Sequence, residues 1–134
     1  MPKHDFKVVP YKADLSFEEI KFTETVTVDD DIILYTIDTL NWIKAAWNSI
    51  DNLQVGLNYY GGTFFYSDSL VTFKSILTGW VSIFEHATEE FKLANSMEPE
   101  KLFKKQIVLE EFNSVIHLCD EALKEEKVLV HYGI

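Results

Sequence analysis

The sequence contains no arginine. All twelve basic residues are lysine, against 22 aspartates and glutamates, so the formal net charge is −10. Bidentate recognition of phosphate groups and guanine edges leans on arginine, and a nucleic-acid surface needs a positive footprint. Both shortages argue against DNA or RNA as a direct partner. An acidic chain suits a basic protein partner, and a net charge of this size also keeps a protein soluble.

Cysteine and long apolar runs are equally scarce. Cys119 is the one cysteine, so an intramolecular disulfide is impossible. The first fifteen residues hold no apolar core of signal-peptide length, and charges interrupt every longer apolar stretch. We therefore expect a cytoplasmic protein from a reducing compartment, with no membrane-spanning segment and no cofactor.

What is present is enough to form a core. Apolar residues make up 47% and aromatic residues 14% of the 134 residues, which fits one globular domain over residues 1–134. Residues 1–19, with Pro2 and Pro10, are expected to be partly irregular, with a short strand at 6–9. No repeats or linker-like tracts divide the chain.

Strand patterns predict two hairpins. Residues 20–28 alternate apolar and polar side chains, and residues 32–37 are apolar on both faces, so we predict a half-buried and a central strand. Asp29 to Asp31 form the turn between them in this interpretation. Residues 55–67 predict a second hairpin, in which Gly61-Gly62 adopts the positive φ angles of a type I′ turn.

Helical periodicity predicts three helices. A medium helix is expected over residues 38–53, a long one over 68–94, and a third from Pro99 onward, with irregular first turns. Residues 127–133 return to strand character. The predicted fold is α+β: two β-hairpins and a closing strand packed with one medium and two long antiparallel helices.

Two helical segments carry a spacing that suits metal ligands. Residues three and four apart share a helical face, and this spacing relates two sets of side chains, which are His86, Glu89 and Glu90, and His117, Asp120 and Glu121. However, both histidines, Glu89 and Glu121 project to the polar side of their helices, whereas metal sites in helical bundles use inward-facing ligands. We therefore expect no metal.

No motif predicts catalysis. Cys119, with His86, His117 or His131 as its base, is the one candidate nucleophile, but it lies within an apolar helical stripe where cysteine acts as a small hydrophobic residue. The chain has no Gly-x-Ser-x-Gly elbow and no glycine-rich phosphate loop. Adjacent carboxylate pairs are typical of solvated helix faces. We expect the protein not to be an enzyme.

The acidic turn is the first candidate for partner binding. Asp29, Asp30 and Asp31 repel one another, and a basic partner would relieve that repulsion and be steered by it. Aromatic anchors would come from Trp42, Tyr59 and Tyr60. The alternative acidic surface consists of two glutamate pairs, which are Glu89, Glu90, Glu110 and Glu111. The other interpretation of all these residues is a solvated loop, two solvated faces and a buried aromatic core.

The stretch TIDTLNWIKAAWNSIDNL, residues 36–53, carries a family resemblance. A β-run, a helix with spaced aromatics and a following hairpin in a small acidic chain resemble immunity proteins of bacterial contact-dependent growth inhibition and related polymorphic toxin systems. The resemblance implies a protein that binds one basic toxin domain, often a nuclease, and blocks its active site or substrate face. The alternatives are a small metal-binding or enzymatic protein that uses His86 and His117, and an oligomeric accessory protein.

Overall fold

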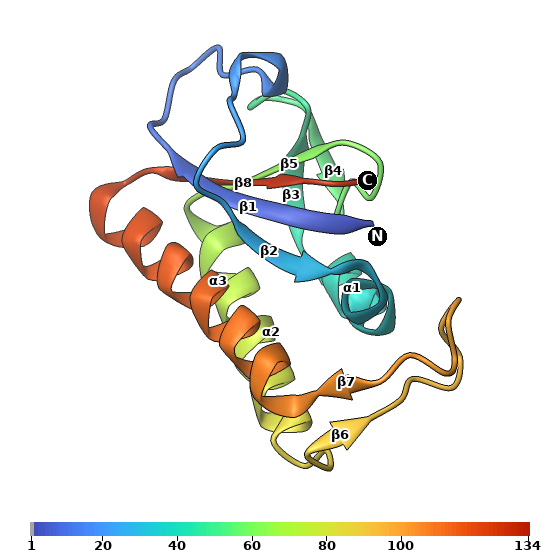
Figure 1. Ribbon diagram of the computed structural model, residues 1–134. Helices are drawn as coiled ribbons and strands as arrows, with labels where there is room; N and C mark the ends of the chain where they lie inside the picture. The colour runs from blue at the N-terminus through green and yellow to red at the C-terminus, as the bar shows by residue number, and fades with distance from the viewer. Residues whose placement is uncertain (1) are drawn as a thin grey trace.

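The computed structural model describes residues 2–134 and confirms the α+β fold class. Its main element is a six-stranded antiparallel sheet with the strand order β2-β1-β8-β5-β3-β4, and a two-stranded sheet pairs β6 with β7 (Figure 1). The strands are β1 Lys3–Val9, β2 Val26–Asp29, β3 Lys44–Trp47, β4 Leu53–Val55, β5 Gly62–Phe65, β6 Glu90–Phe91, β7 Phe103–Lys104 and β8 Val128–Tyr132. The predicted closing strand is thus confirmed as β8, in the middle of the sheet.

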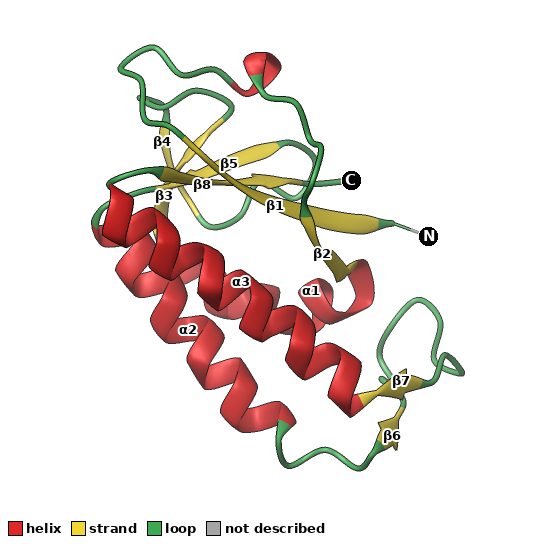
Figure 2. Cartoon of the chain, turned by 60° about the vertical axis from the view of Figure 1, so that its left-hand side comes forward, coloured by secondary structure: helices red, strands yellow, loops and turns green. Residues whose placement is uncertain are grey.

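Two long antiparallel helices, α2 (Asp68–Phe84) and α3 (Lys105–Glu125), lie side by side on one face of the sheet (Figures 1 and 2). Their buried stripes follow the predicted helical period, because side chains three and four apart share one face. The buried residues are Leu70, Phe73, Leu77, Trp80 and Phe84 in α2, and Val108, Phe112, Val115, Cys119 and Ala122 in α3. Within residues 2–134, no helix is long and apolar enough to cross a membrane.

The opposite face of the sheet is covered by the N-terminal segment that follows β1 (Figure 2). Residues 10–22 include the short 3-10 turn η1 (Phe17–Glu19), and their apolar side chains pack on a smaller core. The buried members of this core are Leu15, Ala46, Ile50, Phe64, Val128 and Val130. Because both faces are covered, residues 128–131 of the central strand β8 are buried on both sides.

The predicted second strand of the first hairpin is wrong. Residues 32–37 belong mainly to helix α1 (Asp30–Thr36), and β2 pairs with β1 instead. Asp29 caps α1 by accepting the Asp31 N–H at 2.9 Å, and two acidic residues follow in the first turn, where the helix dipole favours them. An apolar run of this length suits a buried helix as well as a buried strand, and the cap decides between them.

The predicted medium helix over residues 38–53 is also wrong. The segment forms a 3-10 helix, η2 (Ile37–Trp42), and then β3 and part of β4. Ala45 and Ala46 are buried in β3, between β4 and β5. Both alanines favour helix by propensity, but pairing with two neighbouring strands overrides such weak local preferences.

The Gly61-Gly62 turn and the helix ends also differ from expectation. The predicted second hairpin over residues 55–67 is wrong, because β4 and β5 each pair with β3 and not with each other. Neither glycine has a positive φ angle, so the type I′ assignment is wrong as well. Gly62 is required for a different reason, because a Cβ atom there would collide with the Phe17 ring. Helix α2 ends at Phe84 rather than near residue 94, and α3 begins at Lys105 rather than at Pro99. The short β6–β7 pair and its long loop occupy the interval.

Candidate functional site

The three consecutive aspartates have internal partners. The Lys101 ammonium lies 2.6 Å from the Asp29 carboxylate and 3.6 Å from that of Asp31. Asp30 and Asp31 are only 8% and 7% exposed. The sequence assigned them to the turn of a hairpin, but they form the start of α1, where capping and ion pairing relieve the repulsion among them.

Asp30 ends a buried chain of hydrogen bonds that links four elements. His4 Nε2 lies 2.8 Å from Asp30 Oδ1, and His4 Nδ1 lies 2.8 Å from His131 Nε2. At the far end, Thr63 Oγ1 lies 3.2 Å from His131 Nδ1. The Tyr59 hydroxyl also donates to Asp30 Oδ1, at 2.5 Å. Both histidines and Thr63 are fully buried, so this chain ties β1, β5 and β8 to the start of α1.

One arrangement of protons satisfies this chain when Asp30 is ionised and both histidines are neutral. The carboxylate accepts, so His4 carries its proton on Nε2 and accepts at Nδ1 from the His131 Nε2–H. His131 Nδ1 then accepts from the Thr63 hydroxyl, whose oxygen in turn accepts the Asn58 N–H at 2.8 Å. If both histidines were charged, two N–H groups would face each other. The pair therefore holds at most one extra proton.

Burial lowers the pKa of both histidines below the ordinary value. For His131 the second cause is the neighbouring His4. For His4 the hydrogen bond to Asp30 and the charge of Asp30 partly oppose the effect of burial. Both imidazoles are neutral at neutral pH, which agrees with the proton arrangement that the hydrogen bonds require.

The two acidic groups predicted as alternative binding surfaces meet at one end of the molecule. Glu111 lies close enough to Asp29 for that residue's backbone hydrogen bond and charge to act on its pKa. The Lys105 N–H donates to the Glu89 carbonyl at 2.9 Å, and β6 carries Glu90. Residues 29–31 and 85–111, which we call the acidic end, contain ten acidic residues and four lysines. They therefore carry −6 of the formal charge of −10.

Glu111 has the most strongly shifted pKa among the carboxyl groups of the acidic end. It is half-buried, and burial, together with the charge of Asp29, raises its pKa to about 7, while Lys3 and Lys101 oppose the shift. Burial also raises the pKa of Asp31, against the effect of Lys101. Burial therefore disfavours the ionised form of both carboxyl groups in the folded protein.

The Glu111→Gln variant is expected to be more stable than the parent protein at pH 8, by about 1 kcal/mol after allowance for solvent screening. The folded carboxyl loses its proton near pH 7, whereas the unfolded one loses it near 4.5. Its contribution is therefore complete below pH 4.5 and is lost as the pH rises to 7. Urea unfolding at pH 8 and pH 4.5 measures this. The exposed Glu110→Gln variant is the control, and an equal gain in both variants would contradict the assignment.

A groove crosses the acidic end between α1 and the β6–β7 loop. It has a volume of about 680 Å³, and Figure 1 shows the loop projecting beside α1. The lining residues that matter here are Asp31, Leu34, Tyr35, Lys92, Ser96 and Met97. Tyr35 and Met97 are strongly exposed apolar side chains. Ser96 Oγ is buried and has no hydrogen-bond partner within residues 2–134, so the groove has both an apolar surface and an unused polar group.

The predicted aromatic anchors divide into two kinds. Trp42 and Tyr60 are 75% and 80% exposed. Tyr59 is half-buried, binds Asp30, and packs its ring edge-on to that of Tyr60 at 4.8 Å between centroids. Tyr60 therefore lies next to the start of α1. The exposure of Trp42 and Tyr60 suits interface anchors, and their contact with a partner remains a prediction.

The doubled histidine spacing does not form one site. His86 follows the end of α2, beside the start of α3, whereas His117 lies twelve residues into α3, about 18 Å further along the axis. Both side chains are exposed. No three His, Cys, Asp or Glu side chains within residues 2–134 are placed to hold a metal ion together.

Cys119 lies in the core, as its position in the apolar stripe predicts. It is fully buried, and burial raises the pKa of its thiol to about 12. The thiol therefore remains protonated at neutral pH, and such a group is a poor nucleophile.

Sequence reasoning missed the partners of the aspartates. His4 and Lys101 carried no motif, and the signal that existed was weak: His131 stands in the predicted closing strand, whereas His4 precedes the short strand predicted at residues 6–9. The partners come from distant parts of the chain, so only pairing of β1 with β8 brings the histidines together. Comparisons with protein-family models, curated proteins and solved structures gave no match for this chain.

Proposed function

We propose that this protein is a non-enzymatic binding protein for a basic protein domain. In this proposal it is an immunity protein that occludes the active site or substrate face of a cognate bacterial toxin, such as a nuclease. The acidic end is the docking surface. Docking is steric and electrostatic, so no catalytic group is needed on this chain.

The observation that carries the proposal is the concentration of charge around the groove. The acidic end carries −6 of the total charge of −10, and the groove within it exposes Tyr35 and Met97. An apolar centre with a charged rim is the usual organisation of a protein interface. A surface of one sign also steers an oppositely charged partner and speeds its association.

The structure changes which acidic side chains should contact the partner. Asp29 and Asp31 share Lys101, and Asp30 binds His4 and Tyr59. Charge reversal at these positions would therefore disturb folding as well as binding. Glu89 and Glu90 have exposed side chains and give the cleaner test.

The first experiment is capture of a partner from native lysate at low salt, followed by elution with high salt. Recovery of one basic protein in about equal amount, released by salt, would support the proposal. With that protein in hand, the Glu89→Lys/Glu90→Lys variant is expected to slow association about tenfold at low salt and to flatten its salt dependence. Stopped-flow or surface-binding kinetics measure both effects.

The matched control is Glu18→Lys/Glu19→Lys. These two glutamates are also adjacent and exposed, but they lie in η1, on the segment that covers the other face of the sheet. The same change in net charge should there slow association less than threefold. Equal effects of the two double variants would mean that overall charge, rather than the acidic end, steers the partner.

A further inference from the structure

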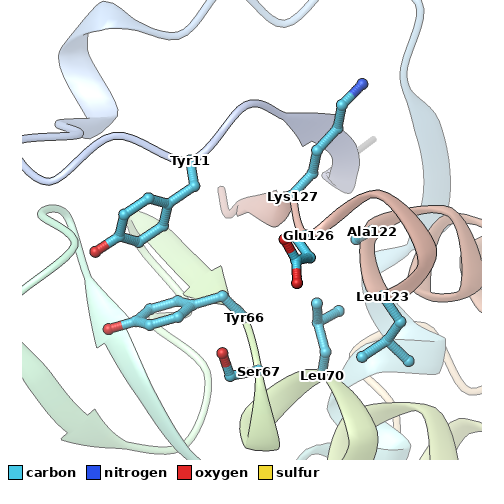
Figure 3. Close-up of a pocket in the computed structure, with 8 residues that line it drawn as sticks. All are labelled: Tyr11, Tyr66, Ser67, Leu70, Ala122, Leu123, Glu126 and Lys127. Atoms are coloured by element: carbon cyan, nitrogen blue, oxygen red, sulfur yellow. The ribbon is translucent and has the colours of Figure 1, made fainter.

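A second cavity lies at the opposite end of the helix pair, where α2 begins and α3 ends. It has a volume of about 400 Å³, and Figure 3 shows its lining side chains. Those used below are Tyr11, Tyr66, Ser67, Leu70, Leu123 and Glu126. They come from three separate parts of the chain, so the cavity exists only in the folded protein.

Two tyrosines form an aromatic wall. The rings of Tyr11 and Tyr66 are 5.9 Å apart between centroids and tilted by 58°. The Tyr66 hydroxyl donates to the Ile50 carbonyl at 2.9 Å, which fixes that ring in place. Leu70 and Leu123 supply apolar surface nearby. A flat or elongated apolar group could contact the tyrosine rings on one side and the two leucine side chains on the other.

Two lining residues adopt backbone conformations that are unusual for their type. Ser67 has φ 52° and ψ −124°, and Glu126 has φ 54° in the left-handed region. Only four non-glycine residues within residues 2–134 have positive φ, and two of them line this cavity. Glu126 ends α3 in the left-handed form that glycine usually supplies. Ser67 precedes α2, and its side chain makes no capping hydrogen bond within residues 2–134. Such strain is often found at binding sites.

The cavity lining includes one carboxylate, that of Glu126, and one ammonium group, that of Lys127. In Figure 3 the Glu126 carboxylate points into the hollow between Tyr66 and Leu70, whereas the Lys127 ammonium points away from it. Lys127 lies 3.7 Å from the Glu125 carboxylate, and no lysine within residues 2–134 forms an ion pair with Glu126. Asp68, in the first turn of α2, offsets the positive end of that helix. The charged group that faces the hollow is therefore a hydrogen-bond acceptor, which suits a cationic donor better than an anion.

We propose that this cavity binds the guanidinium group of an arginine side chain presented by another polypeptide. A guanidinium is planar, stacks on aromatic rings, and pairs with a carboxylate through two parallel N–H donors. Tyr11 and Tyr66 supply the rings, Glu126 the carboxylate, and the Ser67 hydroxyl an additional acceptor. The three-carbon stem of arginine lies against Leu70 and Leu123. The chain itself has no arginine, so the ligand comes from outside. The inference rests on the proposed function only for the source of that arginine, a basic partner.

Titration with N-acetyl-arginine-N-methylamide, followed by ¹H–¹⁵N NMR, tests the assignment. The amides of Ser67, Leu70 and Glu126 should shift in a saturable way. The matching citrulline derivative has almost the same shape but no charge, and it should bind at least tenfold more weakly. Shifts that are absent, that fall elsewhere, or that are equal for the two probes would overturn the proposal.

Two variants locate the binding on the protein. Glu126→Gln should weaken binding of the arginine probe at least fivefold, and Tyr11→Ala should do the same. Glu121→Gln, an exposed residue on the same helix, makes the same change in charge and should alter binding less than twofold. Equal effects of the two glutamine variants would overturn the assignment. Thermal melting shows that each variant is folded. Because the probe is a free small molecule, its failure is separate from a failure to capture a partner protein.

Discussion

Replacement of Asp30 with alanine is expected to lower the free energy of unfolding by about 3 kcal/mol. The change removes the acceptor of the His4 Nε2–H and of the Tyr59 hydroxyl, both of which bind the same carboxylate oxygen. His4 is fully buried, so its N–H cannot turn to water. Urea or thermal unfolding at pH 7 measures the loss, which is a large part of the stability of a domain of this size.

Two further variants distinguish a lost acceptor from a lost charge. Asn at position 30 retains a carbonyl oxygen that can accept both hydrogen bonds, so Asp30→Asn should cost about 1 kcal/mol, chiefly from the helix dipole and the charge-assisted bonds. The exposed Asp38→Ala variant should change stability by about 0.5 kcal/mol or less. If Asp30→Ala matched Asp38→Ala, the buried chain would not stabilise the fold.

Acidification is expected to destabilise the protein through the histidine pair. In the folded protein the pKa of both His4 and His131 is lowered, so the unfolded chain binds protons first as the pH falls below about 6.5. Their contribution is complete above that pH and is lost progressively below it. We expect the Glu111→Gln variant to lose about 2 kcal/mol between pH 6.5 and pH 5.

The Glu111→Gln background is needed because Glu111 acts in the opposite direction. Its raised pKa makes protonation favour the folded state over this pH range, and the raised pKa of Asp31 acts in the same direction. The parent protein should therefore lose less stability than the variant. A second control removes the exposed histidines, with His86→Asn and His117→Asn, and should leave the slope unchanged. If the free energy of unfolding of Glu111→Gln did not change between pH 6.5 and pH 5, the folded protein would bind protons at His4 and His131 as readily as the unfolded chain does.

These expectations distinguish acidic residues that stabilise the fold from acidic residues that are proposed to bind a partner. The three aspartates that stand out in the sequence stabilise α1 and the strands next to it, through Lys101, His4 and Tyr59. Glu89 and Glu90 make no such contacts with their side chains and remain exposed. The proposed docking surface is therefore tested best at the glutamates.

Local periodicity and overall composition are enough to predict several features of this protein. The α+β class, the buried stripes of α2 and α3, the burial of Cys119 and the strand β8 all follow from spacing that repeats along one segment. Prediction from the local pattern failed where the same residues suit either a helix or a strand. Residues 32–37 are apolar enough for a buried strand or a buried helix, and the Asp29 cap decides for the helix.

The tertiary structure alone decided the rest, because the deciding contacts join distant residues. β3 is a strand because β4 and β5 pair with it, against the helix preference of Ala45 and Ala46. The acidic run is internal because His4, which precedes it in the sequence, and Lys101, which follows it, both reach it over long sequence separations. Strand pairing and burial between distant residues outweigh helix and strand propensities of less than about 1 kcal/mol per residue. The partners of the aspartates, the groove and the cavity therefore could not be predicted from the local sequence pattern.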